Sequence, residues 1–207
     1  MSQIIGLVGF IGSGKNAAAD ILVEKQGFVV ESFAKSVKDS VAVVFGWDRQ
    51  MLEGATPQSR IWRETKDEFW SQKLGKDISP RYALQLMGTE AGRNVFGTDL
   101  WVWSLLNRLE SNKNYVITDT RFPNELKMIA ESGGKIIRIK RGPEPEWYDE
   151  AKDINSIQGG QTMPLYPDIH FSEWAWIDSP HITHTITNDG TIKDLEDKLW
   201  MVCHLLS

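Results

Sequence analysis

Residues 9–15 read Gly-Phe-Ile-Gly-Ser-Gly-Lys and match the pattern G-x-x-x-x-G-K. They follow a short apolar run and precede a helical pattern, which is the context that this phosphate-binding motif requires. Glycines let successive backbone N–H groups curl around a phosphate, and Lys15 supplies an ammonium group for the β- and γ-phosphates. The alternative is a turn that binds nothing. The predicted ATP-binding residues are Gly9, Ile11, Gly12, Ser13, Gly14, Lys15 and Asn16.

Asn16 stands where a Ser or Thr hydroxyl would normally contact Mg²⁺. An amide oxygen is an acceptable ligand for this hard cation. The alternative is a metal ion held through water molecules and a carboxylate elsewhere in the chain. Asp119 is the candidate carboxylate, because it follows an apolar run that predicts a buried strand. We therefore expect Mg²⁺ near Asn16 and Asp119, bound directly or through water.

A second set of polar residues suits a phosphorylated acceptor. Lys38 follows the second predicted strand, although a solvated helix start explains it equally well. Arg81 and Gln85 are four residues apart on a predicted helix, so they share a face that ends at Gly88 and Thr89. Arginine offers a forked donor for phosphate, and glutamine a donor and acceptor pair for a base edge. Surface salt bridging is the alternative for this pair.

Asp119 and Arg121 lie at the carboxyl end of the predicted strand 115–118. There the carboxylate can hold Mg²⁺ or accept a proton, and the guanidinium can bind a phosphate. A purely structural Asp–Arg pair is the alternative. The adjacent Asn124 and Glu125 are more simply explained as the cap and first turn of a helix.

A third cationic group ends the predicted strand 135–140. Alternation places Arg138 and Lys140 on one face and Arg141 beyond it. Arginines on a closing element stabilise the charge that develops during phosphoryl transfer, so Arg141 is the candidate. His170 and Glu173 follow the next long stretch and are candidates for acceptor binding, His170 also as a base. The spacing of Cys and His residues argues against a zinc site.

These residues need a scaffold that brings strand ends together. Apolar runs predict strands at 4–8, 28–33, 115–118, 135–140 and 184–187, alternating with helices at about 14–24, 98–109, 124–131 and from 191 onward. A helix start is also expected at Ser79, which caps, followed by Pro80. Alternating strands and helices predict an α/β fold whose parallel sheet is covered on both faces. Ligands then bind at the carboxyl ends of the strands.

The composition limits the partners of this 207-residue chain. Lys and Arg number 23 against 28 Asp and Glu, a net charge of −5, which argues against a protein that coats nucleic acid or an anionic membrane. No apolar stretch approaches the ~20 residues of a membrane helix. A single cysteine cannot form an internal disulfide, so we expect a reducing, cytoplasmic location.

The phosphate loop identifies a nucleotide ligand and leaves the reaction open. A length near 200 residues, a helical insertion after the second strand and a late lid candidate favour a nucleotide or small-metabolite kinase. The absence of an N-K-x-D signature argues against a Ras-like GTPase. Two alternatives stay open: a kinase of another small acceptor, such as dephospho-coenzyme A or a sugar acid, and a non-catalytic module that binds ATP.

Taken together, these motifs resemble the deoxynucleoside monophosphate kinases of tailed bacteriophages, the T4-type family. The resemblance implies a P-loop kinase fold of three layers, α/β/α, with a helical insertion that binds the nucleoside monophosphate and a lid. It also implies ATP-dependent phosphorylation of deoxynucleoside 5′-monophosphates to diphosphates, Mg²⁺ dependence and a homodimer. Ala17 departs from the family, which often has Thr there, and residues 142–168 form a longer stretch than the T4-like pattern has.

The predicted domain organisation is one P-loop kinase domain over 1–207. Its core comprises 1–33, 115–141 and 180–207, with the acceptor-binding insertion at about 34–110 and the lid at about 142–179. In the predicted mechanism, the acceptor is held by Arg81 and Arg121, and the catalytic residues are Lys15, Asp119, Arg121 and Arg141. Eight of nine tryptophans lie in the insertion and around the lid, so we expect their fluorescence to respond to the acceptor more than to ATP.

Overall fold

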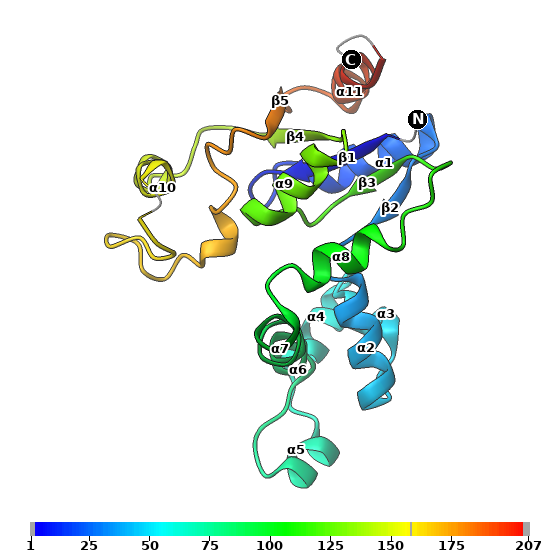
Figure 1. Cartoon of the computed structure of the whole chain (residues 1–207), viewed down its shortest axis with the longest axis vertical. Coiled ribbons are helices and arrows are strands. Elements are labelled where there is room, and N and C mark those ends of the chain that lie inside the picture. Colours follow the sequence, from blue (N-terminus) through cyan, green and yellow to red (C-terminus); the bar gives the residue numbers. More distant parts are fainter. Residues whose placement is uncertain (1–2, 158, 205–207) are drawn as a thin grey trace. The chain divides into compact units, whose positions relative to one another are not determined.

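The contacts within the chain divide it into two compact units, one of residues 1–32 and 109–207 and one of residues 33–108 (Figure 1). The computed structural model describes residues 3–157 and 159–204. Within these ranges, every helix is too short or too polar to cross a bilayer.

The first unit is built on a parallel sheet, as the sequence predicted. In the described residues its five strands have the order β2-β3-β1-β4-β5, and every pairing is parallel. The central strand β1 pairs with β3 through Ile5 and Val116, and with β4 through Leu7 and Ile137. The strands are β1 (Ile4–Val8), β2 (Val29–Glu31), β3 (Tyr115–Ile117), β4 (Lys135–Lys140) and β5 (Ile182–Thr187).

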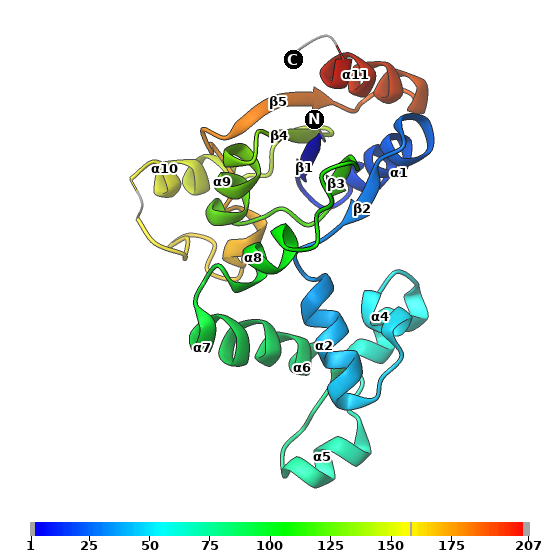
Figure 2. The ribbon, with the colours of Figure 1, turned by 45° about the vertical axis from the view of Figure 1, so that its right-hand side comes forward.

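Helices cover both faces of this sheet, which confirms the three-layer prediction. On one face α1 (Lys15–Gln26) and α11 (Ile192–His204) lie side by side (Figure 2). Leu22 and Leu199 there belong to one buried cluster with Leu7 and Ile137. On the other face α9 (Pro123–Glu131) packs close to β1, since a Cβ added at Gly6 would lie 2.6 Å from Cδ1 of Ile129.

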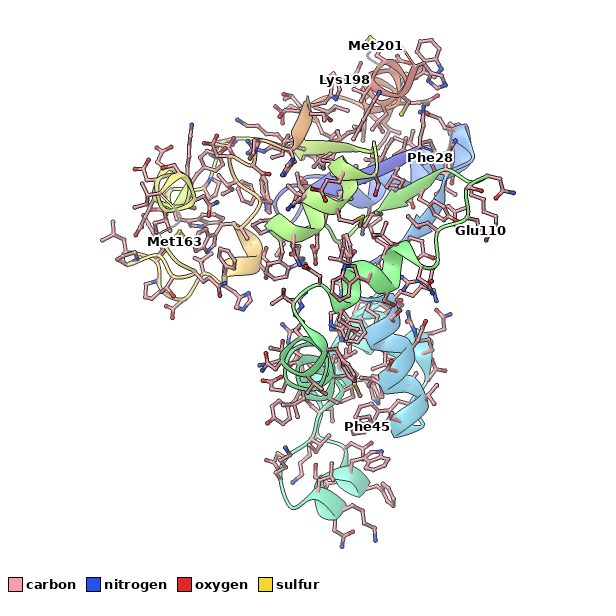
Figure 3. The ribbon with its side chains drawn as sticks, viewed as in Figure 1. Phe28, Phe45, Glu110, Met163, Lys198 and Met201 are labelled. Carbon is pink, nitrogen blue, oxygen red and sulfur yellow. The ribbon has the colours of Figure 1, made fainter. Side chains whose placement is uncertain are left out.

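The segment 142–179, predicted as a lid, carries its own secondary structure and buried side chains. It contains α10 (Tyr148–Ser156) and a short 3₁₀ helix, η2 (Phe171–Glu173). Met163, labelled in Figure 3, is fully buried, as is Trp174. Asn155 ties the segment together, because its Nδ2 donates to the carbonyl oxygens of Trp174 at 3.0 Å and Ile177 at 2.9 Å.

The second unit is helical throughout its regular structure. Its core contains Val41, Leu52 and Ile78, against which Trp47 and Trp62 pack. The predicted cap at Ser79 is confirmed, since its side chain accepts a hydrogen bond from the backbone N–H of Tyr82 at 3.2 Å. The elements are α2 (Lys35–Phe45), α3 (Arg49–Glu53), α4 (Pro57–Glu64), α5 (Glu68–Leu74), α6 (Pro80–Leu86), the π-helix η1 (Met87–Arg93), α7 (Asn94–Phe96) and α8 (Leu100–Leu106).

Cys203 lies on the buried side of α11, and burial raises the pKa of its thiol to about 11. Because the thiolate is the reactive form, we expect alkylation of the native protein at pH 8 to be roughly a hundredfold slower than that of an ordinary cysteine. Mass spectrometry after iodoacetamide treatment measures this rate. The unfolded chain in denaturant is the control and should react fully, whereas fast labelling of the native protein would contradict the prediction.

Candidate active site

The phosphate loop, residues 9–15, joins β1 to α1 in a conformation that needs glycine. Gly9, Gly12 and Gly14 all have positive φ, of 143°, 79° and 101°. A Cβ at Gly9 would overlap the carbonyl oxygen of Ile139, and one at Gly14 would overlap the side-chain amide of Asn188. Space and backbone conformation therefore both exclude other residues at these two positions.

Lys15 begins α1 and its ammonium group is held over the loop. Its Nζ donates to the carbonyl oxygens of Gly9 at 2.6 Å and Phe10 at 2.9 Å. An ammonium has three N–H donors, so one is left for a phosphate. Burial lowers the pKa of Lys15 and the nearby charge of Arg121 lowers it further, while Glu173 acts in the opposite direction. A bound phosphate would favour the charged form again.

The turn after β5 supports the same loop. Asn188 donates from Nδ2 to the carbonyl oxygen of Ser13 at 2.9 Å, and its backbone N–H donates to the carbonyl oxygen of Lys140 at 2.7 Å. The carboxylate of Asp189 accepts a hydrogen bond from the backbone N–H of Gly142 at 2.7 Å. The loop and the start of segment 142–179 are thus both attached to this turn.

Arg121 lies in the turn between β3 and α9 and is held from two directions. Its Nη1 pairs with Oε1 of Glu173 at 2.9 Å. Its backbone N–H donates to Oε2 of the buried Glu125 at 2.8 Å, and that oxygen also accepts from the N–H of Phe122 at 3.0 Å. Glu125 therefore fixes the turn that carries Arg121. Together with the effect on Lys15, this places Lys15, Arg121 and Glu173 in one electrostatic group.

The other predicted residues of the first unit occupy three different settings. His170 caps η2, since its Nδ1 accepts from the backbone N–H of Ser172 at 3.2 Å. Asp119 is partly buried just beyond the end of β3. Arg141 is exposed, and within the described ranges it forms no ion pair.

The predicted acceptor helix of the second unit continues past Gly88. After α6 the chain forms the π-helix η1, so the face that was predicted to end at Gly88 runs on, and that prediction is wrong. The carbonyl oxygen of Gly88 accepts a hydrogen bond from Nε1 of Trp101 at 2.8 Å. Trp101 also packs closely on Gly92, where a Cβ would lie 2.5 Å from its ring. Gly92 thus leaves room for Trp101 of α8 against the π-helix, and the backbone carbonyl of Gly88 adds a hydrogen bond to it.

The π-helix determines which side chains share a face. In an α-helix four residues exceed one turn, whereas in a π-helix they fall short of one. The side chain of Gln85 is therefore rotated slightly around the helix axis relative to that of Arg81 in α6, and this rotation is reversed along η1. This keeps Arg81, Gln85, Thr89 and Arg93 along one stripe of the combined helix. Gln85 and Thr89 are exposed, and Nη1 of Arg81 pairs with Oε1 of the exposed Glu64 at 3.1 Å, which is the surface salt bridge given as the alternative for Arg81.

Comparison with known proteins decides the family. The chain is 33% identical over 152 residues to a protein of Acanthamoeba polyphaga mimivirus to which deoxynucleotide monophosphate kinase activity is ascribed, covering 67% of this chain and 74% of that protein. The chain belongs to the deoxynucleoside monophosphate kinase family. The deoxynucleoside-5′-monophosphate kinase of Escherichia phage T5 matches at 24% identity, covering 99% of this chain and 97% of that protein. The resemblance seen in the motifs is confirmed.

Other comparisons add less about this kinase. No family model matches the chain. Among solved structures, shikimate kinase from Acinetobacter baumannii matches with a TM-score of 0.45 and 15% identity, over 98% of this chain and 93% of that one. That similarity is too low to support any inference about the substrate.

Lys38 of the kinase has a strong partner within its own unit. Its Nζ pairs with Oε2 of Glu53 at 2.5 Å, and its side chain is only 16% exposed. Arg49 pairs with the same Glu53 and with Asp39, each at 2.6 Å. This network joins α2 to α3, so Lys38 has a structural role that differs from the solvated helix start given as the alternative. Its predicted contact with an acceptor stays a prediction.

The sequence predicts that two oxygen donors, Asn16 and Asp119, hold Mg²⁺ in this kinase. Within the described residues no group of three or more His, Cys, Asp or Glu side chains could hold a metal ion. Mg²⁺ commonly takes one or two protein ligands and completes its shell with water and substrate phosphates. Asn16, exposed in the first turn of α1, and Asp119, beyond the end of the neighbouring β3, supply donors of the right kind. The residues present therefore fit this cation.

Sequence reasoning missed two supporting residues of the kinase and one further residue on the stripe with Arg81. Glu125 was explained as a helix start, and no role was given to Asn188 or Arg93. For two of these residues, the place in the sequence could have indicated a role. Asn188 follows β5 at the carboxyl edge of the sheet, and Arg93 continues the spacing of four from Arg81. The hydrogen bond of Glu125 to the backbone of Arg121 had no signal beyond a capping position.

Proposed function

We propose that this kinase transfers the γ-phosphoryl group of ATP to the phosphate of a deoxynucleoside 5′-monophosphate. An oxygen of the acceptor phosphate forms a bond to the γ-phosphorus, the bond from that phosphorus to the bridging oxygen breaks, and ADP leaves with a deoxynucleoside diphosphate. One observation carries the proposal: a phosphate loop with a preorganised Lys15, in a chain of the deoxynucleoside monophosphate kinase family.

The donor half of the reaction is assigned to residues 9–15. The backbone N–H groups of the loop and the N-terminus of α1 bind the phosphates of ATP. The free donor of Lys15 contacts the β- and γ-phosphates, and Asn188 maintains the loop by holding Ser13. Asn16 and Asp119 would hold Mg²⁺, which neutralises phosphate charge when it is bound.

Within the second unit, acceptor binding is assigned to the stripe on α6 and η1. Arg81 and Arg93 offer guanidinium forks for the acceptor phosphate, with Gln85 and Thr89 between them as neutral donors and acceptors for the sugar or base. Arg121 and Arg141 stabilise charge on the transferring group, as arginines do in phosphoryl transfer. The pair with Glu173 offsets part of the charge of Arg121, so exchanging Glu173 for a phosphate would make the full charge available.

The proposal predicts turnover with deoxynucleoside monophosphates as acceptors. Each of the common ones, with its ribonucleotide counterpart, dephospho-coenzyme A and a sugar acid, is offered with ATP and Mg²⁺, and ADP formation is followed in a coupled assay. Turnover only with dephospho-coenzyme A or the sugar acid would establish the alternative kinase. ATP hydrolysis that ignores every acceptor, or ATP binding without turnover, would refute the proposal.

The same assay tests the acceptor stripe. Arg93→Gln should raise the KM for the acceptor roughly tenfold or more, the cost of one charged hydrogen bond to phosphate, and leave the KM for ATP unchanged. Arg60→Gln is the matched control, since Arg60 is exposed in the same unit and bonds the backbone of Gly54 at 3.0 Å. An unchanged acceptor KM in Arg93→Gln would remove Arg93 from the site. The homodimer that the family resemblance implies is measured separately by sedimentation.

A further inference from the structure

Arg138 has an environment that its position on β4 does not explain. Its side chain is 11% exposed and its Nη2 pairs with Oε2 of Glu144 at 2.6 Å. Its Nη1 donates to the hydroxyl of Tyr148 at 3.0 Å. The guanidinium carbon also lies 5.1 Å from the ring centre of Trp176, 5.2 Å from that of Tyr148 and 5.8 Å from that of Phe10. These distances are those of cation–π contacts with three rings.

Phe10 connects this cluster to the phosphate loop. Its ring centre lies 5.0 Å from that of Trp176 and 5.2 Å from that of Trp147, nearly perpendicular to the latter. Its backbone carbonyl accepts a hydrogen bond from Lys15 at 2.9 Å. The neighbouring Ile11, by contrast, is 87% exposed. We call Phe10, Arg138, Trp147, Tyr148 and Trp176 the Phe10 cluster.

We propose that Arg138 is a positioning residue for ATP binding, which acts through Phe10 on the carbonyl that orients Lys15. The proposal rests on the proposed function only in taking ATP as the ligand of the loop. A loop rich in glycine loses much conformational freedom when it closes on phosphates. Fixing Phe10 beforehand reduces that loss, so the loop binds ATP more tightly than a free loop would.

The chemistry of the site favours an arginine over an apolar residue. A planar guanidinium can lie against aromatic rings while its N–H groups bond Glu144 and Tyr148. Burying this charge is offset by the carboxylate of Glu144. That carboxylate also pairs with Lys140 at 2.8 Å, so Glu144 keeps a cationic partner when Arg138 is replaced. Arg138→Met therefore removes the guanidinium without leaving the Glu144 carboxylate unpaired.

The cluster also joins segment 142–179 to the loop. Trp147, Tyr148 and Trp176 all belong to that segment, and each contacts Phe10. Any rearrangement of the loop on ATP binding must move against these rings. Trp147 and Trp176 should therefore report ATP in fluorescence, a signal that the sequence assigned mainly to the acceptor.

The test measures ATP binding without an acceptor, so it is independent of phosphoryl transfer. Arg138→Met should raise the Kd for a non-hydrolysable ATP analogue roughly tenfold or more in calorimetry, and Phe10→Leu should do the same. The double variant should bind no more than about threefold more weakly than either single variant, because both break one link. Lys135→Met is the matched control on β4, since Lys135 bonds the carbonyl of Val202 at 2.8 Å, and it should leave the Kd unchanged.

Each outcome has one meaning for Arg138. An unchanged Kd in folded Arg138→Met, or losses in the two variants that multiply, would reduce the cluster to ordinary packing and overturn the proposal. Should Arg138→Met fail to fold, Arg138→Lys keeps the charge but loses the planar fork, and the same Kd criterion applies to it. If the wild type binds ATP but phosphorylates no acceptor, the proposed function fails while this test still decides the role of Arg138.

Discussion

Lys15→Met is expected to lower kcat/KM for phosphoryl transfer at least about a thousandfold. The substitution removes the one cation that the structure preorganises within the phosphate loop, where two carbonyl oxygens hold it. Charge on the transferring phosphoryl group would then lose a donor that needs no reorganisation during the reaction. The coupled assay with ATP and a deoxynucleoside monophosphate measures the loss.

Lys25→Met is the matched control, because Lys25 is exposed in the last turn of the same helix. It should keep wild-type activity. Circular dichroism and thermal unfolding should show that both variants remain folded. A folded Lys15→Met variant with more than about a tenth of wild-type activity would contradict the role of Lys15.

The sheet and the phosphate loop could be predicted closely because local sequence determines them. β1 and β4 have the predicted bounds, since β1 is an apolar run that ends at Gly9 and β4 begins directly after Gly134. The second strand is shorter than predicted, at Val29–Glu31. It lies at the edge of the sheet, and Phe28 and Phe33, the apolar residues that extended the prediction, lie outside its pairing with β3.

The contacts that shape the site were less predictable because they join distant residues. Phe10 contacts Trp176 and Arg121 pairs with Glu173, and no periodicity in the sequence relates the members of either pair. The π-helix escaped prediction for another reason. Trp101 of α8 packs on Gly92 and donates a hydrogen bond to the carbonyl oxygen of Gly88, and such tertiary contacts leave no periodic signal in the sequence.

Arg121→Met is the second change with a large expected effect, a fall in kcat of at least about a hundredfold. The guanidinium stands close enough to Lys15 to lower the pKa of that residue, so both cations serve one anionic region. Without a nucleotide, Arg121 is paired with Glu173. While that pair is closed, Glu173 offsets part of the charge that Arg121 presents to a phosphate. Single-turnover measurements at saturating ATP and acceptor separate this loss from weaker binding.

Glu173→Gln tests the exchange of partners from the other side. If Glu173 competes with phosphate for Arg121, the Glu173→Gln variant should bind nucleotides more tightly than the wild type, whereas Arg121→Met should bind them more weakly. Glu173→Gln should raise the affinity only while Arg121 is present, so the double variant should resemble Arg121→Met alone. Weaker nucleotide binding in Glu173→Gln would mean that Glu173 contributes to the acceptor site directly. Arg121 and Glu173 would then act as a fixed pair that binds the acceptor together.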